Sequence, residues 1–157
     1  MEAKDLVYAL GILLTFALGV WNLVANYRGT RRTSFINTVT SQRVKWIEQL
    51  RQDISAYSGL TYTWCFSDLA GKPEEYEVIR EIDRLRHVIR LRLNPEGTYD
   101  QRIEHLIEEI PKYTDSSQRD MLTKALDELT TTTQLLLKEE WEKVKREAED
   151  GNLKRDT

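Results

Sequence analysis

A long apolar run near the N-terminus is the first feature of the hydrophobic pattern. The run over residues 6–27 reads LVYALGILLTFALGVWNLVANY and contains no charged residue. As a helix, this run would be roughly 33 Å long, which matches the hydrocarbon thickness of a bilayer. The pattern therefore predicts one transmembrane helix over residues 6–27, preceded by a short tail over residues 1–5.

Behind this run, apolar residues recur every three or four positions, which is typical of amphipathic helices. These repeats, with turn sequences at 71–73 and 94–97, predict helices over about residues 34–69, 73–93, 99–110 and 116–149. Gly29 and the Thr and Ser residues after it form only a weak interruption, so the first of these helices could continue the span. The residues expected on the apolar faces of these helices are Ile36, Val39, Ile47, Leu50, Ile54, Tyr57, Val78, Ile79, Ile82, Leu85, Ile89, Leu93, Ile103, Leu106, Ile107, Ile110, Leu122, Leu126, Leu129, Leu136, Trp141 and Val144.

Composition agrees with an all-α protein, because 31% of the residues are charged and the chain has only 3 Pro and 7 Gly. Roughly 125 residues follow the span, enough for one soluble domain. Two long helices flanking two shorter ones predict an elongated antiparallel helical bundle over residues 34–149. A basic juxtamembrane segment over residues 28–33 and a polar tail over residues 150–157 complete the expected organisation.

The charges on either side of the apolar run predict its orientation. Lys4 is the only basic residue before the run, whereas three arginines follow it directly. Positive residues favour the cytoplasmic side of a membrane, so the N-terminus is expected outside and the C-terminal domain in the cytoplasm. The same arginines are expected to attract anionic lipid. They are Arg28, Arg31 and Arg32.

Two other interpretations of the apolar run were weighed. A cleaved signal peptide has a basic start and small residues before its cut site, but here the start is net acidic and bulky Leu23 precedes the candidate site after Ala25. A buried helix of a soluble complex can also be this apolar. The arginines directly after the run favour a membrane border instead.

Small and amide residues share one face of the predicted span. They follow one another at steps of four, four, three and four, so a helix aligns them. In lipid, small residues allow close helix approach and amides hydrogen-bond across the contact, so this stripe predicts self-association. The alternative is that glycines and a membrane-edge asparagine occur in many spans. The stripe consists of Gly11, Thr15, Gly19, Asn22 and Asn26.

The sequence contains no pattern that predicts catalysis or a cofactor. It has no glycine-rich phosphate loop, no G-x-S-x-G, no H-E-x-x-H and no paired cysteine motif. His87 and His105 lie on different predicted helices, and no E-x-x-H spacing supports a metal site. The single cysteine, Cys65, is expected to be a small buried apolar residue. We therefore expect a protein that is not an enzyme and holds no metal.

Basic residues are concentrated in the second soluble helix. On a helix they form a cationic face that could receive an anionic ligand, a nucleic acid or an acidic partner. The alternative, which is favoured, is a solvated face paired with Glu77, Glu81 and Asp83 or with the acidic last helix. The candidate ligand face consists of Arg84, Arg86, Arg90 and Arg92.

The segment NTVTSQRVKWIEQLR over residues 37–51 contains the spacing R-x-x-W-I-x-x-L-R. It resembles a pattern found just after a single span in small uncharacterised bacterial membrane proteins, some of them in mobile-element or phage-defence settings. The resemblance implies an inner-membrane protein with a cytoplasmic helical domain and supplies no catalytic residues. Its half-buried face could seat the last helix or another protein. That face consists of Arg43, Trp46, Ile47, Leu50 and Arg51.

These observations predict a non-enzymatic, membrane-anchored helical oligomer that presents a bundle, packed like a coiled coil, to a protein partner in a bacterial defence or stress system. Lipids and further copies of the chain are expected partners, and nucleic acid is not. One alternative is a membrane-perturbing effector that opens a leak through Asn22 and Asn26. A second is a ligand or nucleic-acid sensor that uses the arginines of residues 80–92.

Overall fold

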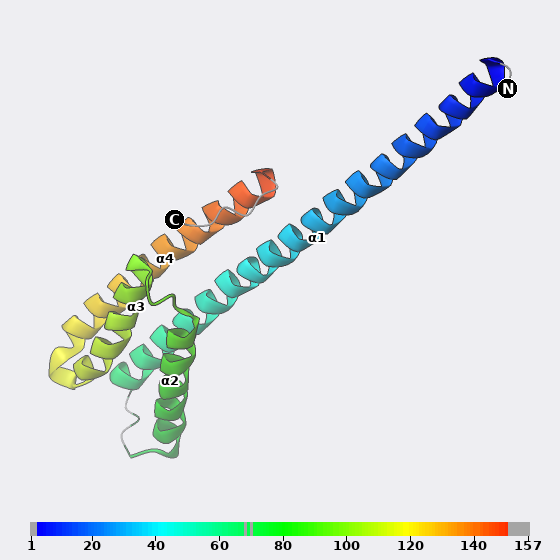
Figure 1. Cartoon of the computed structure of the whole chain (residues 1–157). Coiled ribbons are helices and arrows are strands. Elements are labelled where there is room, and N and C mark those ends of the chain that lie inside the picture. Colours follow the sequence, from blue (N-terminus) through cyan, green and yellow to red (C-terminus); the bar gives the residue numbers. More distant parts are fainter. Residues whose placement is uncertain (1–2, 68, 70, 151–157) are drawn as a thin grey trace. The chain divides into compact units, whose positions relative to one another are not determined.

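The computed structural model describes residues 3–67, 69 and 71–150, with side chains at all of these except 3, 5–7, 9, 28–36, 116 and 150. This part of the chain is helical and contains no strand, which confirms the predicted all-α class. Figure 1 shows the elements in chain order. They are the α-helices α1 (Ala3–Phe66), α2 (Pro73–Arg92), α3 (Thr98–Glu109) and α4 (Arg119–Asp150), with the 3₁₀ helices η1 (Ile110–Tyr113) and η2 (Ser116–Gln118).

Helix α1 contains both the predicted span and the first predicted soluble helix in one element. The weak interruption around Gly29 does not break it, and Gly59 does not end it. A glycine inside a helix costs only about 1 kcal/mol relative to alanine, and the arginines around residue 30 are good helix formers. The described residues divide into two compact units, one with residues 3–41 and 147–150, the other with residues 42–146.

The unit of residues 42–146 contains the hydrophobic core. All four α-helices contribute to it, and in Figure 1 α2, α3 and α4 gather beside the end of α1. The periodic positions of the sequence supply most of this core, including Leu50 and Tyr57 of α1, which have no exposed surface. The buried apolar residues are Ile47, Leu50, Ile54, Tyr57, Ile82, Leu85, Ile89, Ile103, Leu106, Ile107, Ile110, Leu122, Ala125, Leu126, Leu129, Leu136, Leu137 and Val144.

Trp141 is the predicted apolar-face residue that is exposed. Four others are only half-buried, and the side chain of Ile36 lies outside the described ones; the four are Val39, Val78, Ile79 and Leu93. The Trp141 side chain remains 43% exposed, whereas Val144, one turn later, is buried. Of the three consecutive leucines in α4, Leu136 and Leu137 are buried and Leu135 is 45% exposed. The buried stripe of α4 therefore follows the predicted one through Leu136 and Val144, but it includes Leu137 and leaves Trp141 exposed.

Aspartate side chains accept backbone hydrogen bonds in the turn before α3 and at the start of η2. The Asp100 carboxylate, buried at the start of α3, accepts a hydrogen bond from the Asn94 backbone at 2.9 Å. Gly97 leaves room for this carboxylate, because a Cβ there would lie 2.2 Å from Asp100 Oδ2. Asp115 accepts from the Ser117 backbone at 2.8 Å, but the turn that it caps is 3₁₀. The last α-helix consequently begins at Arg119 and not at residue 116.

Candidate interaction surfaces

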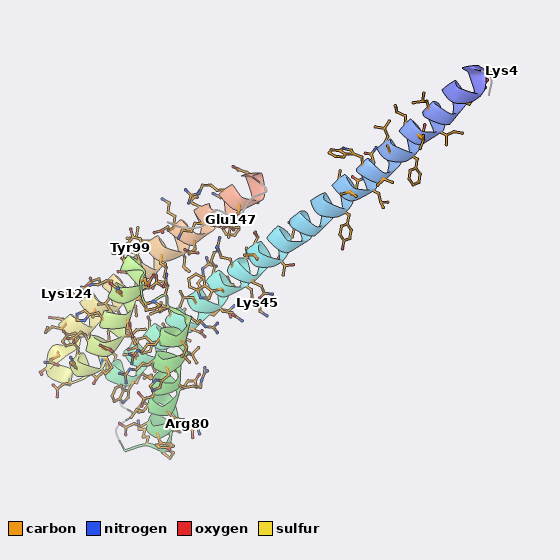
Figure 2. All side chains as sticks on the ribbon, viewed as in Figure 1. Lys4, Lys45, Arg80, Tyr99, Lys124 and Glu147 are labelled. Atoms are coloured by element: carbon orange, nitrogen blue, oxygen red, sulfur yellow. The ribbon has the colours of Figure 1, made fainter. Side chains whose placement is uncertain are left out.

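The apolar part of α1 is a continuous exposed surface. The segment Leu10–Tyr27 has a mean hydropathy of 1.5, and none of it is buried within the protein. Trp21 and Leu23, for example, are 75% and 74% exposed. Figure 2 shows these side chains as sticks between the labelled Lys4 and Lys45. By length and composition, this segment of α1 can cross a membrane.

All five residues of the predicted self-association stripe lie on α1 and are exposed. Thr15 donates its hydroxyl hydrogen bond to the Gly11 carbonyl at 2.9 Å, which satisfies that hydroxyl within the helix. A Cβ at Gly11 or at Gly19 would meet nothing within 4 Å. Asn22 and Asn26 lie one turn apart at the end of the stripe. The stripe is thus open to close approach by another helix, and its role stays a prediction.

The juxtamembrane arginines lie in the helical part of α1. The side chains of Arg28, Arg31 and Arg32 lie outside the described ones, so their predicted contact with lipid stays a prediction.

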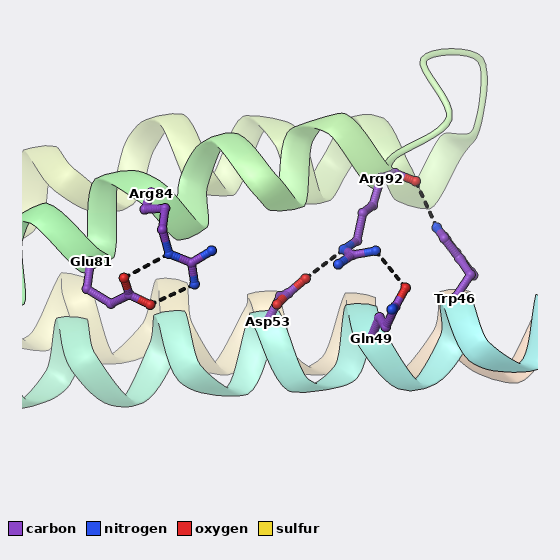
Figure 3. Close-up of polar contacts among 6 residues, drawn as sticks. All are labelled: Trp46, Gln49, Asp53, Glu81, Arg84 and Arg92. Carbon is purple, nitrogen blue, oxygen red and sulfur yellow. Dashed lines mark hydrogen bonds and ion pairs between the residues drawn. The ribbon is translucent and has the colours of Figure 1, made fainter.

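Arg84 and Arg86 of α2 are paired with carboxylates of the same helix. Arg84 donates two hydrogen bonds to Glu81, at 2.8 and 2.7 Å, as Figure 3 shows. The hydrogen bond from Arg84 lowers the pKa of Glu81. Arg86 pairs with Asp83 at 3.1 Å. These pairs agree with the solvated face that was the favoured alternative, and a role in anion binding stays a prediction.

Arg90 and Arg92, at the end of α2, point to other helices. Arg92 donates from Nε to Asp53 at 2.6 Å and from a terminal nitrogen to Gln49 at 2.9 Å, both on α1 (Figure 3). Arg90 pairs with Glu104 of α3 at 2.9 Å. These two arginines therefore connect helices, which distinguishes them from Arg84 and Arg86.

The predicted face of residues 43–51 also lies within the packed unit. Ile47 and Leu50 are buried, and the Trp46 indole donates to the Arg92 carbonyl at 3.0 Å (Figure 3). Arg43 lies 3.5 Å from Glu140 of α4. Arg51 instead pairs with Glu48 on its own helix and is exposed. Most of this face therefore contacts α2 and α4, as in the interpretation that it seats the last helix.

One arginine bridges each neighbouring pair of helices in the unit of residues 42–146. Arg92 joins α2 to α1, Arg90 joins α2 to α3, Arg102 joins α3 to α4 through Glu128, and Arg43 joins α1 to α4. The sequence analysis missed Asp53, Gln49 and Glu128 as partners. Each lies at least 26 residues from its arginine in the sequence, so no local pattern could have indicated the pairing.

The described residues hold no group of three or more His, Cys, Asp or Glu side chains that could bind a metal ion. Cys65 is half-buried, with its Sγ 3.7 Å from the Thr114 carbonyl. Burial raises the pKa of this thiol, and the nearby Arg119 guanidinium lowers it. A thiol with a raised pKa is a poor nucleophile at neutral pH.

Comparison with known proteins gave no match to a family model, to a curated protein or to a solved structure.

Proposed function

We propose that this chain is a non-enzymatic, single-span membrane protein that self-associates through α1 and presents a helical cytoplasmic domain to a protein partner. The observation that carries the proposal is the exposure of every side chain from residue 10 to residue 27. Exposing this much apolar surface to water is costly, at roughly 25 cal/mol per Å². Lipid removes that cost without requiring any contact from the rest of the chain.

The proposed orientation follows from the three arginines after the apolar segment, which favour a cytoplasmic C-terminal domain and an external N-terminus. For that domain we propose an antiparallel bundle of α1, α2, α3 and α4. The four bridging arginines support it, because they link the helices in the cyclic order α1, α2, α3, α4. The proposed location is a bacterial inner membrane.

Membrane anchoring is tested by fractionation of cells that express the full-length chain with a C-terminal tag. The expected result is that the chain sediments with membranes, resists an alkaline carbonate wash and dissolves only in detergent. Protease added to inside-out vesicles should remove the C-terminal domain, whereas protease added to intact spheroplasts should not. Recovery of the intact chain in the soluble fraction without detergent would contradict the proposal.

Self-association through the stripe is tested by replacing both glycines with leucine, as Gly11→Leu together with Gly19→Leu. The added side chains should separate the helices and lower association in a membrane reporter assay at least several-fold. A matched control, Ala17→Leu with Val24→Leu, also enlarges side chains in the span but on the opposite face of the helix, and it should associate like the wild type. Equal association of all three proteins would remove the stripe from the proposal.

A leak through the assembled spans is the second candidate function. Asn22 and Asn26 are both exposed within the segment Leu10–Tyr27, and amides in lipid need hydrogen-bond partners. Helices that associate through the stripe bring these amides together, where they can hydrogen-bond or line a water path. Depolarisation on expression that Asn22→Leu with Asn26→Leu abolishes, while membrane insertion is kept, would favour this function.

A further inference from the structure

Several buried polar atoms of α1 and α2 lack hydrogen-bond partners in the unit of residues 42–146. Tyr57 and Thr61 have 0% and 1% of their surfaces exposed, although each carries a hydroxyl group. Neither hydroxyl has a hydrogen-bond partner among the described residues, and the same holds for the buried Ser58 Oγ and Arg86 Nε. A buried polar atom without a partner is destabilising, so such a group is expected to have one.

Other threonines in this chain indicate what a helical hydroxyl does when nothing else is near. Five of them donate to the carbonyl four residues earlier, as Thr133 does to Leu129 at 2.7 Å, whereas Thr40 of α1 does not. Thr61 and Ser58 lie within α1, where the same carbonyls are in reach, yet they do not make this bond. Their hydroxyls are therefore directed elsewhere. The threonines that bond in this way are Thr15, Thr123, Thr130, Thr131 and Thr133.

The phenol of Tyr57 lies close to two of the other groups. Burial raises the pKa of Tyr57 above its ordinary value, while the Arg86 charge and the Thr61 hydroxyl lower it. The two hydroxyls thus influence one another, but their geometry is not that of a direct hydrogen bond. Two groups that face each other in this way are suited to share a third, small hydrogen-bonding partner.

We propose that Tyr57, Thr61 and Arg86 form a buried site for one small hydrogen-bond acceptor, the size of a water molecule or a halide ion. Arg86 Nε can only donate, and each hydroxyl can donate. The occupant must therefore accept several hydrogen bonds. This inference is independent of the proposed membrane function.

The sign of a stability change tests the site. Thr61→Val removes the hydroxyl and keeps the shape of the side chain. If the hydroxyl binds an occupant, the variant of the full-length chain in detergent should unfold at a temperature lower by roughly 4 °C. If the hydroxyl has no partner, its removal should raise the unfolding temperature, because a desolvated polar group is lost. A rise or no change would overturn the proposal.

Thr133→Val is the matched control. Thr133 is also buried, at 4% exposed, but its hydroxyl is satisfied by its own helix. Its replacement should shift the unfolding temperature by no more than about 2 °C, the effect expected of a substitution that breaks no tertiary contact. Tyr57→Phe provides a second variant and should behave like Thr61→Val.

Exchange of the salt identifies the occupant. Sodium bromide and sodium gluconate are compared at equal ionic strength, with unfolding temperature as the readout. A halide occupant should give stabilisation by bromide in the wild type that Thr61→Val abolishes and Thr133→Val keeps. A water occupant should give the same unfolding temperature in both salts, together with the destabilisation by Thr61→Val. Stabilisation by bromide that persists in Thr61→Val would show that halide binds elsewhere and would exclude it from this site.

Discussion

Helix α1 has two parts whose apolar side chains lie in opposite environments: one part is exposed and the other is buried by other helices. In the segment Leu10–Tyr27 no residue is buried by the rest of the chain, and Leu23 remains 74% exposed. About 25 residues later along the same helix, Leu50 and Tyr57 have no exposed surface because α2, α3 and α4 pack around them. The apolar content of a helix therefore does not show whether its own chain covers it.

The two parts of α1 differ in the polar groups that lie between their apolar residues. The part of α1 in the unit of residues 42–146 carries charges between its apolar positions, and some of these charges bridge to other helices, as Asp53 does to Arg92. The segment Leu10–Tyr27 has no charge with which to make such a bridge. It can be recognised through its shape and through uncharged polar groups such as the amides of Asn22 and Asn26, which suit lipid and a second copy of the same helix.

Charges placed in the apolar segment should have the largest effect. Leu14→Arg together with Leu18→Arg puts two charges near the middle of the proposed span, at a cost of about 2.5–3.5 kcal/mol each on insertion. The variant should leave the membrane fraction, measured by carbonate extraction and immunoblotting. Leu91→Arg, at a residue of α2 that is 87% exposed, is the control and should remain in that fraction. If both variants stayed in the membrane fraction to the same extent, lipid would not be what covers the segment Leu10–Tyr27.

Truncation of the core should have the next largest effect. Leu50→Ala removes a side chain with no exposed surface and should lower the free energy of unfolding by about 2–5 kcal/mol. Leu23→Ala removes the same atoms from an exposed position of the same helix. It should change the unfolding of the soluble part by less than about 0.5 kcal/mol. Chemical denaturation in detergent, followed by circular dichroism, measures both values.

The bridging arginines should matter more than the arginines of the α2 surface. Arg92→Met leaves the half-buried Asp53 without its partner, and we expect a loss of about 1–3 kcal/mol. Arg80→Met breaks a pair with Glu77 in which both side chains are at least 60% exposed. Such a pair contributes little, so the expected change is within about 0.5 kcal/mol. Similar losses from both variants in thermal denaturation would contradict the distinction between bridging and surface arginines.

Asp100 should give the smallest effect, visible as a pH dependence. Burial and the nearby Glu140 and Glu139 raise its pKa above the ordinary 3.8, while the Asn94 backbone N–H opposes the shift. A raised pKa means that the folded state holds the proton more tightly than the unfolded state. The resulting stabilisation is present below pH 3.8 and is lost as pH rises through the folded-state pKa.

The measurement is the unfolding temperature of the wild type and of Asp100→Asn from pH 3.5 upward. Asparagine keeps an oxygen that can accept from Asn94, but it does not titrate. The wild type should therefore lose stability relative to Asp100→Asn as pH rises through this range. A difference that stays constant with pH would show that the carboxyl group titrates alike in the folded and unfolded states.

Periodicity predicted the helices and most of the core because these depend on local sequence. Leu85 and Leu129 were placed in the core from their spacing alone, and both are buried. Trp141 was placed wrongly because α4 has apolar residues on more than one face, and only packing decides which face is inside. The 3₁₀ turn before Arg119 was also missed, since an aspartate cap has the same local sequence in both helix types.

The candidate site was predicted less completely than the fold. The stripe from Gly11 to Asn26 needs only helical spacing, so sequence sufficed to define it. The arginines of α2 were recognised as a group, but their division into surface and bridging residues depends on partners in α1 and α3. The buried hydroxyls of Tyr57 and Thr61 could not be predicted either, because their lack of a partner is a property of the packed helices.

The tryptophans of α1 place an optical probe in each of its two environments. Trp21 is 75% exposed within the apolar segment, whereas the Trp46 indole is held by the Arg92 carbonyl. In variants that keep only one of the chain's four tryptophans, brominated lipid tails should quench the fluorescence of Trp21 and spare that of Trp46. Unfolding should instead shift the emission of Trp46. One helix thus reports separately on its solvent at one end and on its neighbours at the other.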